Sequence, residues 1–240
     1  MEHYELPLVF FTVFAQWGIG GVLALTVCQS GRKRKFSAVQ YRMLALRFWV
    51  ITVLGSCASL AHLGSPEGAY RSLAGLGNSW LSREVVAFIV LNGVMFCWLL
   101  LCRFKPVQRG VILLGGVTAL VGLGTILVTS QVYYQMPLHP LWHNAATPVA
   151  FLGTAFLTGF MSVAVARACW HLPSSTICNA GIVVGIALSA GALVLRYQVS
   201  GADASSPLLW WQLFASVCVA VWGISRLNSG MRSWVWVILI

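Results

Sequence analysis

The chain has 240 residues, of which 59% are hydrophobic and only 8% are charged, and its mean hydropathy is +0.84. About a quarter of the residues of ordinary soluble domains are charged, so this composition excludes such a domain and indicates a protein of the lipid bilayer. The net charge of +10 lies in short loops between apolar runs, which makes it a signal of membrane topology and argues against nucleic-acid binding.

The apolar runs predict an all-α bundle of about seven transmembrane helices, forming a single integral membrane domain over residues 1–240. A helix needs about 20 apolar residues to cross a bilayer. In sequence order the predicted spans are residues 7–28, 43–63, 84–102, 110–133, 147–169, 176–196 and 208–224. The apolar segment 234–240 is too short to span, and we interpret it as the short remnant of an eighth helix in a truncated protein.

Lysine and arginine alternate between the two sides of this predicted bundle. Loops after odd-numbered spans hold Arg32, Lys33, Arg34, Lys35, Arg42, Arg103, Lys105, Arg109, Arg167, Arg226 and Arg232. Loops after even-numbered spans hold only Arg71, Arg83 and Arg196. Because cytoplasmic loops carry the excess of basic residues, we expect the N-terminus and the 64–83 loop outside the cytoplasm, and the C-terminus inside.

Two ionisable residues stand out because they lie at span ends on the same predicted side of the membrane. His62 closes the second span and Glu84 opens the third. Ionisable groups at membrane depth are costly and often functional, and an imidazole beside a carboxyl group can exchange protons. Two structural alternatives stay open: His62 as an interfacial histidine with a satisfied hydrogen bond, and Glu84 as a helix cap.

Two further groups at this side have either a binding or a structural interpretation. Arg71 and Arg83 either hold an anion or a partner's acidic surface, or are solvated loop charges. Tyr133, Tyr134 and Gln135 either line a pocket or belong to the interfacial aromatic belt.

Several cofactor classes are not expected. A bis-histidine haem needs two histidines on facing helices, and only His62 lies in a span. The seven cysteines form no CxxC pair, so we expect no iron–sulfur cluster in this protein. Carboxylates and histidines do not cluster as metal ligands do, and Gly18, Gly20 and Gly21 lie inside an apolar run rather than in a nucleotide-binding loop.

The residues around this pair resemble a known family. The segment Ser59–Pro66, which includes His62 and Gly64, and the segments 71–73 and 78–84, which end at Glu84, are similar to those of the membrane anchor subunit of bacterial dimethyl sulfoxide reductase. The opening segment 5–12, Val132, Tyr133, Trp142, Thr147 and Pro148 also fit that family. The resemblance covers most of the sequence up to about residue 170.

The resemblance implies a multi-pass protein of the bacterial inner membrane with eight spans and a periplasmic N-terminus. It implies that His62 and Gly64 belong to a menaquinol-binding segment and that Glu84 takes part in quinol chemistry. Electrons would pass to an iron–sulfur subunit and then to a molybdopterin catalytic subunit of a heterotrimer used in anaerobic respiration. The terminal acceptor is set by the catalytic subunit, so this sequence does not define it.

Two other functions stay open. A purely structural membrane anchor with a degenerate quinol site would show the same hydropathy. A small transporter would need broken helices and ionisable groups near the midplane, whereas the charged groups here lie at span ends.

Overall fold

In the computed structural model, which describes residues 6–31, 35–62, 77, 79–104, 108–138 and 142–200, the protein folds into six long helices. They are α1 (Leu6–Ser30), α2 (Ala38–His62), α3 (Trp80–Phe104), α4 (Arg109–Tyr134), α5 (Ala146–Cys169) and α6 (Thr176–Ser200). All six are long and apolar enough to cross a membrane, which confirms the first six predicted spans. The predicted seventh span and the 234–240 segment lie outside the described residues.

The helices extend beyond the apolar runs that predicted them. α2 begins at Ala38 rather than at residue 43, and α3 begins at Trp80 rather than at residue 84. A helix of 25 residues is about 37 Å long, whereas the hydrocarbon core of a bilayer is about 30 Å thick. The length of the apolar run therefore corresponds to the thickness of the hydrocarbon core. The helix itself is longer, because its backbone hydrogen bonds continue beyond the apolar run.

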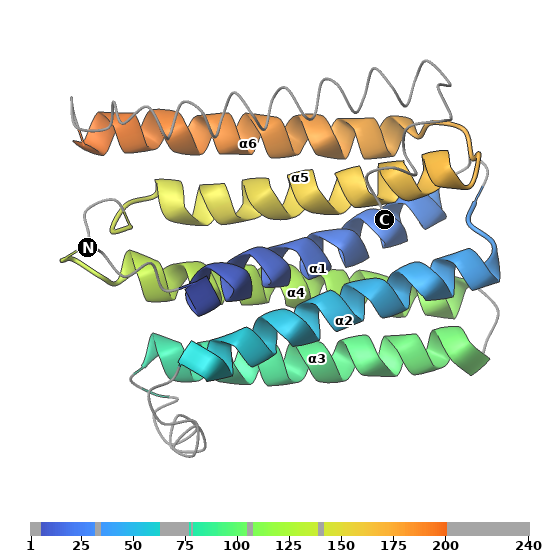
Figure 1. The fold of residues 1–240 in the computed structure, drawn as a ribbon, viewed down its shortest axis with the longest axis horizontal. Coiled ribbons are helices and arrows are strands. Elements are labelled where there is room, and N and C mark those ends of the chain that lie inside the picture. Colours follow the sequence, from blue (N-terminus) through green and yellow to red (C-terminus); the bar gives the residue numbers. More distant parts are fainter. Residues whose placement is uncertain are drawn as a thin grey trace.

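α1 is the central helix of the bundle. It packs against α2, α4, α5 and α6, and Figure 1 shows it between the α5–α6 pair and the crossing helix α2. The close contact with α5 depends on glycine, because a Cβ atom added at Gly20 would collide with the backbone of Ala155, and one added at Gly159 would collide with the backbone of Gly20. Small residues at such crossings let membrane helices approach closely, so the glycines of the first span serve packing.

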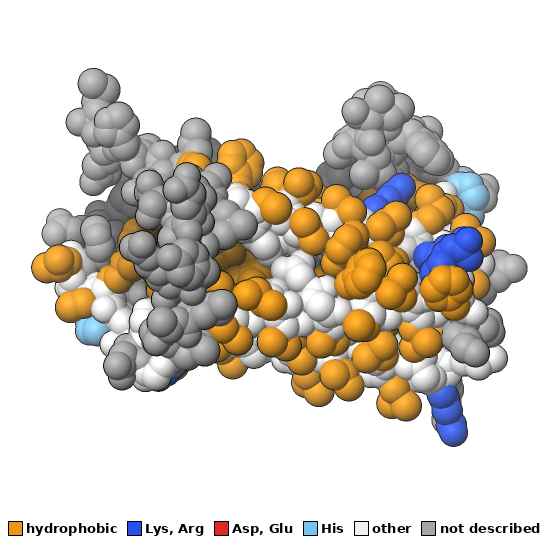
Figure 2. All heavy atoms as spheres, turned by 90° about the horizontal axis from the view of Figure 1, so that it is seen from below, with side chains coloured by type: hydrophobic (Ala, Val, Ile, Leu, Met, Phe, Trp, Pro, Cys, Tyr) orange, Lys and Arg blue, Asp and Glu red, His pale blue; other side chains and the backbone are white. Residues whose placement is uncertain are grey.

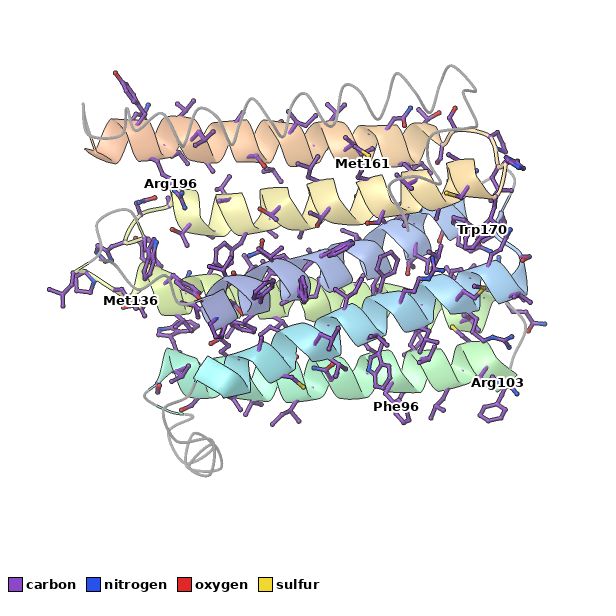
Figure 3. All side chains as sticks on the ribbon, in the orientation of Figure 1. Phe96, Arg103, Met136, Met161, Trp170 and Arg196 are labelled. Carbon is purple, nitrogen blue, oxygen red and sulfur yellow. The ribbon has the colours of Figure 1, made fainter. Side chains whose placement is uncertain are left out.

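Successive helices run in opposite directions, so the bundle has two distinct ends (Figure 1). We define the Glu84 end as the end where α1, α3 and α5 begin and α2, α4 and α6 finish. The opposite end is the Arg167 end. Figure 3 shows Arg196 near the Glu84 end, and Arg103 and Trp170 at the Arg167 end.

The flanks between the two ends are apolar. Figure 2 shows hydrophobic side chains covering the middle of the visible face, with most of the visible Lys and Arg side chains toward one end. Exposed apolar residues include Val50 and Leu54 on α2, Ile89 on α3, and Leu113 and Leu120 on α4. In water such a surface would be unfavourable by about 25 cal/mol per Å², so its natural environment is lipid.

Candidate functional site

Glu84 is buried in the second turn of α3, and its side chain is only 4% exposed. Among the described residues, no group forms a hydrogen bond with its Oε1 atom. One turn further along α3, Phe88 packs against Phe11 of α1 with ring centroids 5.1 Å apart, so the next turn of the helix is packed by apolar side chains. The first turn of α3 contains no acidic residue. Glu84 is therefore too deep in the helix to cap it, and the capping interpretation was wrong.

Thr129 of α4 is the polar neighbour of Glu84. Its side chain is also 4% exposed, and its hydroxyl lies near enough to the carboxyl group to interact with it. The two groups do not reach hydrogen-bond geometry, and the Thr129 Oγ1 atom has no partner within the described part of the protein. Two buried polar side chains thus lie together with unused hydrogen-bonding capacity.

An aromatic cluster follows one turn after Thr129. Tyr133 is 7% exposed, and its ring lies 5.5 Å from the ring of Trp142 and 5.5 Å from that of Phe151. Tyr133 is therefore a packing residue that joins α4 to α5, and does not belong to a lipid-facing aromatic belt. Tyr134, the last residue of α4, lies beside His143 of the α4–α5 connection, with ring centroids 5.3 Å apart.

His62 is the last residue of α2, and its backbone reaches the level of Glu84. Halfway along the α2–α3 pair, Asn92 donates a hydrogen bond to the Ser56 hydroxyl at 3.0 Å. From this link the helical rise of 1.5 Å per residue places Glu84 about 12 Å along α3 and His62 about 9 Å along α2, in the same direction. The two residues thus lie within about 3 Å in depth, while the His62 side chain, Gly64 and Arg71 are outside what the structure describes.

Arg83 contacts residues at the start of α3. Its guanidinium group stacks on the ring of Trp80 at 4.5 Å and donates a hydrogen bond to the Gly77 carbonyl oxygen at 2.9 Å. It therefore organises the start of α3.

The sequence profile of one family, described as DMSO reductase anchor subunit (DmsC), matches residues 1–204. The protein belongs to this family. Membership and the six apolar helices together make it a multi-pass membrane protein.

Three relatives of the anchor-subunit family show how the similarity is distributed. The C subunit of the anaerobic dimethyl sulfoxide reductase of Haemophilus influenzae is 38% identical over 160 residues, which cover 65% of the present sequence and 56% of the relative. The corresponding C subunit of Escherichia coli is 34% identical over 163 residues, covering 65% and 55%. The E. coli anaerobic dimethyl sulfoxide reductase subunit YnfH is 29% identical over 238 residues, covering 96% and 82%. The protein thus spans about half the length of the first two relatives. No solved structure matches it.

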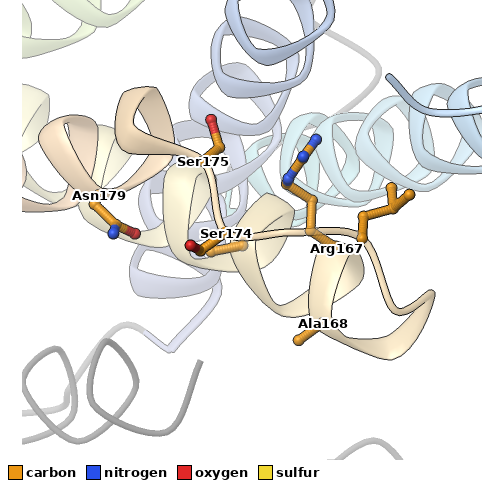
Figure 4. Close-up of a pocket in the computed structure, with 7 residues that line it drawn as sticks. Arg167, Ala168, Ser174, Ser175 and Asn179 are labelled. Carbon is orange, nitrogen blue, oxygen red and sulfur yellow. The ribbon is translucent and has the colours of Figure 1, made fainter. Parts of the chain in front are cut away.

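The Arg167 end of this anchor-family protein holds a buried cation of structural character. Arg167 is 2% exposed, and its Nε and Nη2 atoms donate hydrogen bonds to the Pro173 carbonyl oxygen at 3.1 and 2.9 Å. Beside it is a small pocket of about 20 Å³, large enough for one water molecule. Figure 4 shows Arg167, Ser174, Ser175 and Asn179 around this pocket. The pocket is too small for a quinol ring.

The described residues contain no group of three or more His, Cys, Asp or Glu side chains that could hold a metal ion. The six cysteines in the described ranges are free. We therefore assign no metal ligands within these ranges of the anchor-family protein.

Sequence reasoning found Glu84 and His62 but missed Thr129. A carboxyl group in an apolar run is conspicuous, whereas a threonine hydroxyl is common in membrane helices. The available signal was a spacing: Thr118, Thr125 and Thr129 recur at intervals of seven and four residues, which places them on one face of a helix. All three are buried.

Proposed function

We propose that this protein anchors a dimethyl sulfoxide reductase-like molybdoenzyme complex in the membrane and oxidises menaquinol at the Glu84 end. The observation that carries the proposal is the burial of the Glu84 carboxyl group, with an unpartnered oxygen, at the same depth as the end of α2 where His62 lies. Membership of the anchor-subunit family supports it. The named relatives are subunits of anaerobic dimethyl sulfoxide reductases.

The proposed orientation places the Glu84 end on the periplasmic side of a bacterial inner membrane. Among the described residues the Arg167 end carries Lys35, Arg42, Arg47, Arg103, Arg109 and Arg167, whereas the Glu84 end carries Arg83 and Arg196. Basic residues are enriched on the cytoplasmic side. The N-terminus is then periplasmic.

The chemistry at this end is proton acceptance. Oxidation of menaquinol to menaquinone releases two electrons and two protons. A neutral imidazole of His62 accepts a hydrogen bond from a quinol hydroxyl and then its proton, as a general base. His62 hands each of the two protons in turn to the Glu84 carboxylate, which releases them to water at the nearby surface. Gly64, two residues after His62, belongs to the proposed quinol-binding segment.

The electrons leave this subunit for its partners. In the proposed complex an iron–sulfur subunit accepts them and passes them to a molybdopterin catalytic subunit, which reduces the terminal acceptor. The anchor's own task is to bind the quinol, receive its protons and position it near the electron-transfer subunit.

The test compares two histidines of the Glu84 end in the purified complex. For His62→Ala we expect quinol-dependent reduction to fall by at least about 100-fold, because a general base contributes about 10²- to 10⁴-fold. Reduction driven by an artificial dye should persist, since the dye bypasses the membrane subunit. His143→Ala is the matched control, because His143 lies in the α4–α5 connection, where it contacts Tyr134, and it should retain both activities.

Quinol-dependent activity that survives His62→Ala would overturn the assignment of His62. A purely structural anchor predicts a different result, which is that the unmodified complex shows no saturable binding of a fluorescent quinol analogue. That outcome would overturn the proposed function as a whole.

A further inference from the structure

The threonines of α4 differ in what their hydroxyl groups bind. Thr118 donates to the Leu114 carbonyl oxygen at 2.7 Å, and Thr125 donates to the Val121 carbonyl oxygen at 2.9 Å. This bond to the residue four positions earlier is the usual way in which a threonine satisfies its hydroxyl inside a helix. Thr12, Thr52, Thr154 and Thr158 on other helices do the same.

Thr129 is the exception on α4. Its hydroxyl has no hydrogen-bond partner among the described residues, although its side chain is as buried as those of the other two. A buried hydroxyl that gives up the bond to its own backbone is unfavourable unless another partner uses it. The nearby group with matching unused capacity is the Glu84 carboxyl on the facing helix α3.

We propose that Thr129 is a positioning residue for Glu84, whose hydroxyl donates a hydrogen bond to the carboxylate when Glu84 is ionised. Both side chains lie at the packed α3–α4 interface, and each has an unpartnered polar atom available to the other. The bond holds the carboxyl group on the α4 side and stabilises its charged form. This inference rests on the proposed function, because it gives the proton-accepting residue a defined partner.

Among the described residues, few other titratable or charged groups lie at the Glu84 end of the helices packed against α3. From the helices packed against α3, His62 ends α2, and Tyr133 and Tyr134 end α4. Arg83 is on α3 itself and stacks on Trp80. The described part of α1 carries no charged residue. Thr129 is thus a hydroxyl donor of α4 whose substitution tests the effect on Glu84 without changing the charge of the site.

The experiment measures the protonation of Glu84 directly in the purified complex. Dicyclohexylcarbodiimide is an apolar reagent that modifies protonated carboxyl groups, and peptide mass analysis locates the adduct on Glu84. The labelling rate is recorded across a pH series for the unmodified protein and for the Thr129→Val, Thr129→Ser and Thr125→Val variants. Glu84→Gln gives the background.

In Thr129→Val the carboxylate loses its donor, so labelling should continue to higher pH, with a midpoint raised by about one pH unit. Thr129→Ser keeps the hydroxyl and should follow the unmodified protein. Thr125→Val removes an equally buried hydroxyl that is bound to its own backbone, and it should leave the profile unchanged.

An unchanged profile in Thr129→Val, or the same shift in Thr125→Val, would overturn the role of Thr129. The proposed function fails by a different observation, which is that Glu84→Gln keeps full quinol-dependent activity. The labelling result does not depend on that activity, so the two failures are distinguishable.

Discussion

Each end of the bundle buries one residue of a type that normally carries charge. The two residues differ in whether their polar atoms have hydrogen-bond partners. At the Arg167 end, Arg167 is 2% exposed, donates two hydrogen bonds to Pro173 and lies with its guanidinium carbon 5.4 Å from the centre of the Phe36 ring. At the Glu84 end, Glu84 is 4% exposed, and its Oε1 atom has no hydrogen-bond partner within the described residues.

The groups around Arg167 are paired, whereas the buried hydroxyl groups of Thr26 and Tyr41 at the same end have no hydrogen-bond partner among the described residues. The backbone leaves α5 through His171, whose φ of 54° is in the left-handed region, and the Leu172 N–H donates to the Arg167 carbonyl oxygen at 2.8 Å. This is the Schellman arrangement of a helix C-terminus. Nearby, the amide of Gln29 pairs with both the N–H and the carbonyl of Phe36. The hydrogen bonds of Arg167 and Gln29 thus fix the α5–α6 connection and the α1–α2 connection.

The difference separates structure from function. A buried polar group that is fully paired adds to stability, whereas an unpaired one is a cost that persists for another reason. We therefore expect substitution of Arg167 to change stability and substitution of Glu84 to change activity.

The largest expected effect is that of Glu84→Gln on quinol oxidation. The amide keeps the shape of the side chain but cannot accept a proton at this site. We expect quinol-dependent activity to fall by about 100-fold or more, while dye-driven activity and thermal stability in detergent stay close to those of the unmodified complex. Glu84→Asp retains a carboxyl group and should keep more of the activity than Glu84→Gln. Equal losses in both variants would contradict a proton-accepting role.

The sequence predicted the helices well because membrane helices depend on a one-dimensional property, the length of an apolar run. Their ends were less accurate, since α2 and α3 continue through Arg42 and Arg83. The central place of α1 could not be read from hydropathy. It depends on which small residues meet across helices, and Gly20 meets Gly159 only after the protein has folded.

The site was predicted in part for a similar reason. Glu84 and His62 interrupt apolar sequence and therefore stand out. Thr129 stands out because its hydroxyl does not bond to the backbone of its own helix. This is visible only in the three-dimensional structure. The capping interpretation of Glu84 was wrong because α3 starts four residues before it.

Next in size is the effect of Arg167→Met on stability. Methionine fills most of the space but leaves the Pro173 carbonyl oxygen without its two bonds and removes the contact with the Phe36 ring. We expect a loss of about 2 to 3 kcal/mol, seen as a lower thermal midpoint in detergent, with unchanged quinol oxidation per folded complex. Arg103→Met, at an exposed position on α3, should change stability by no more than about 0.5 kcal/mol. A selective loss of quinol activity in Arg167→Met would show that Arg167 is not purely structural, and would contradict the proposed difference between Arg167 and Glu84.

The smallest expected effect has the opposite sign and tests the contrast most sharply. In the double variant Glu84→Leu/Thr129→Val both unpartnered groups become apolar, so the α3–α4 interface no longer buries unused polar atoms. Replacing such a pair by apolar groups of similar size is neutral or stabilising, and we expect a gain of about 1 kcal/mol, seen as a higher thermal midpoint, together with loss of quinol oxidation. Thr125→Val, which removes a hydroxyl already bonded to Val121, should show no such gain. A double variant that is destabilised as strongly as Arg167→Met would show that Glu84 is held by bonds essential to the fold, and the Glu84 end would then be as structural as the Arg167 end.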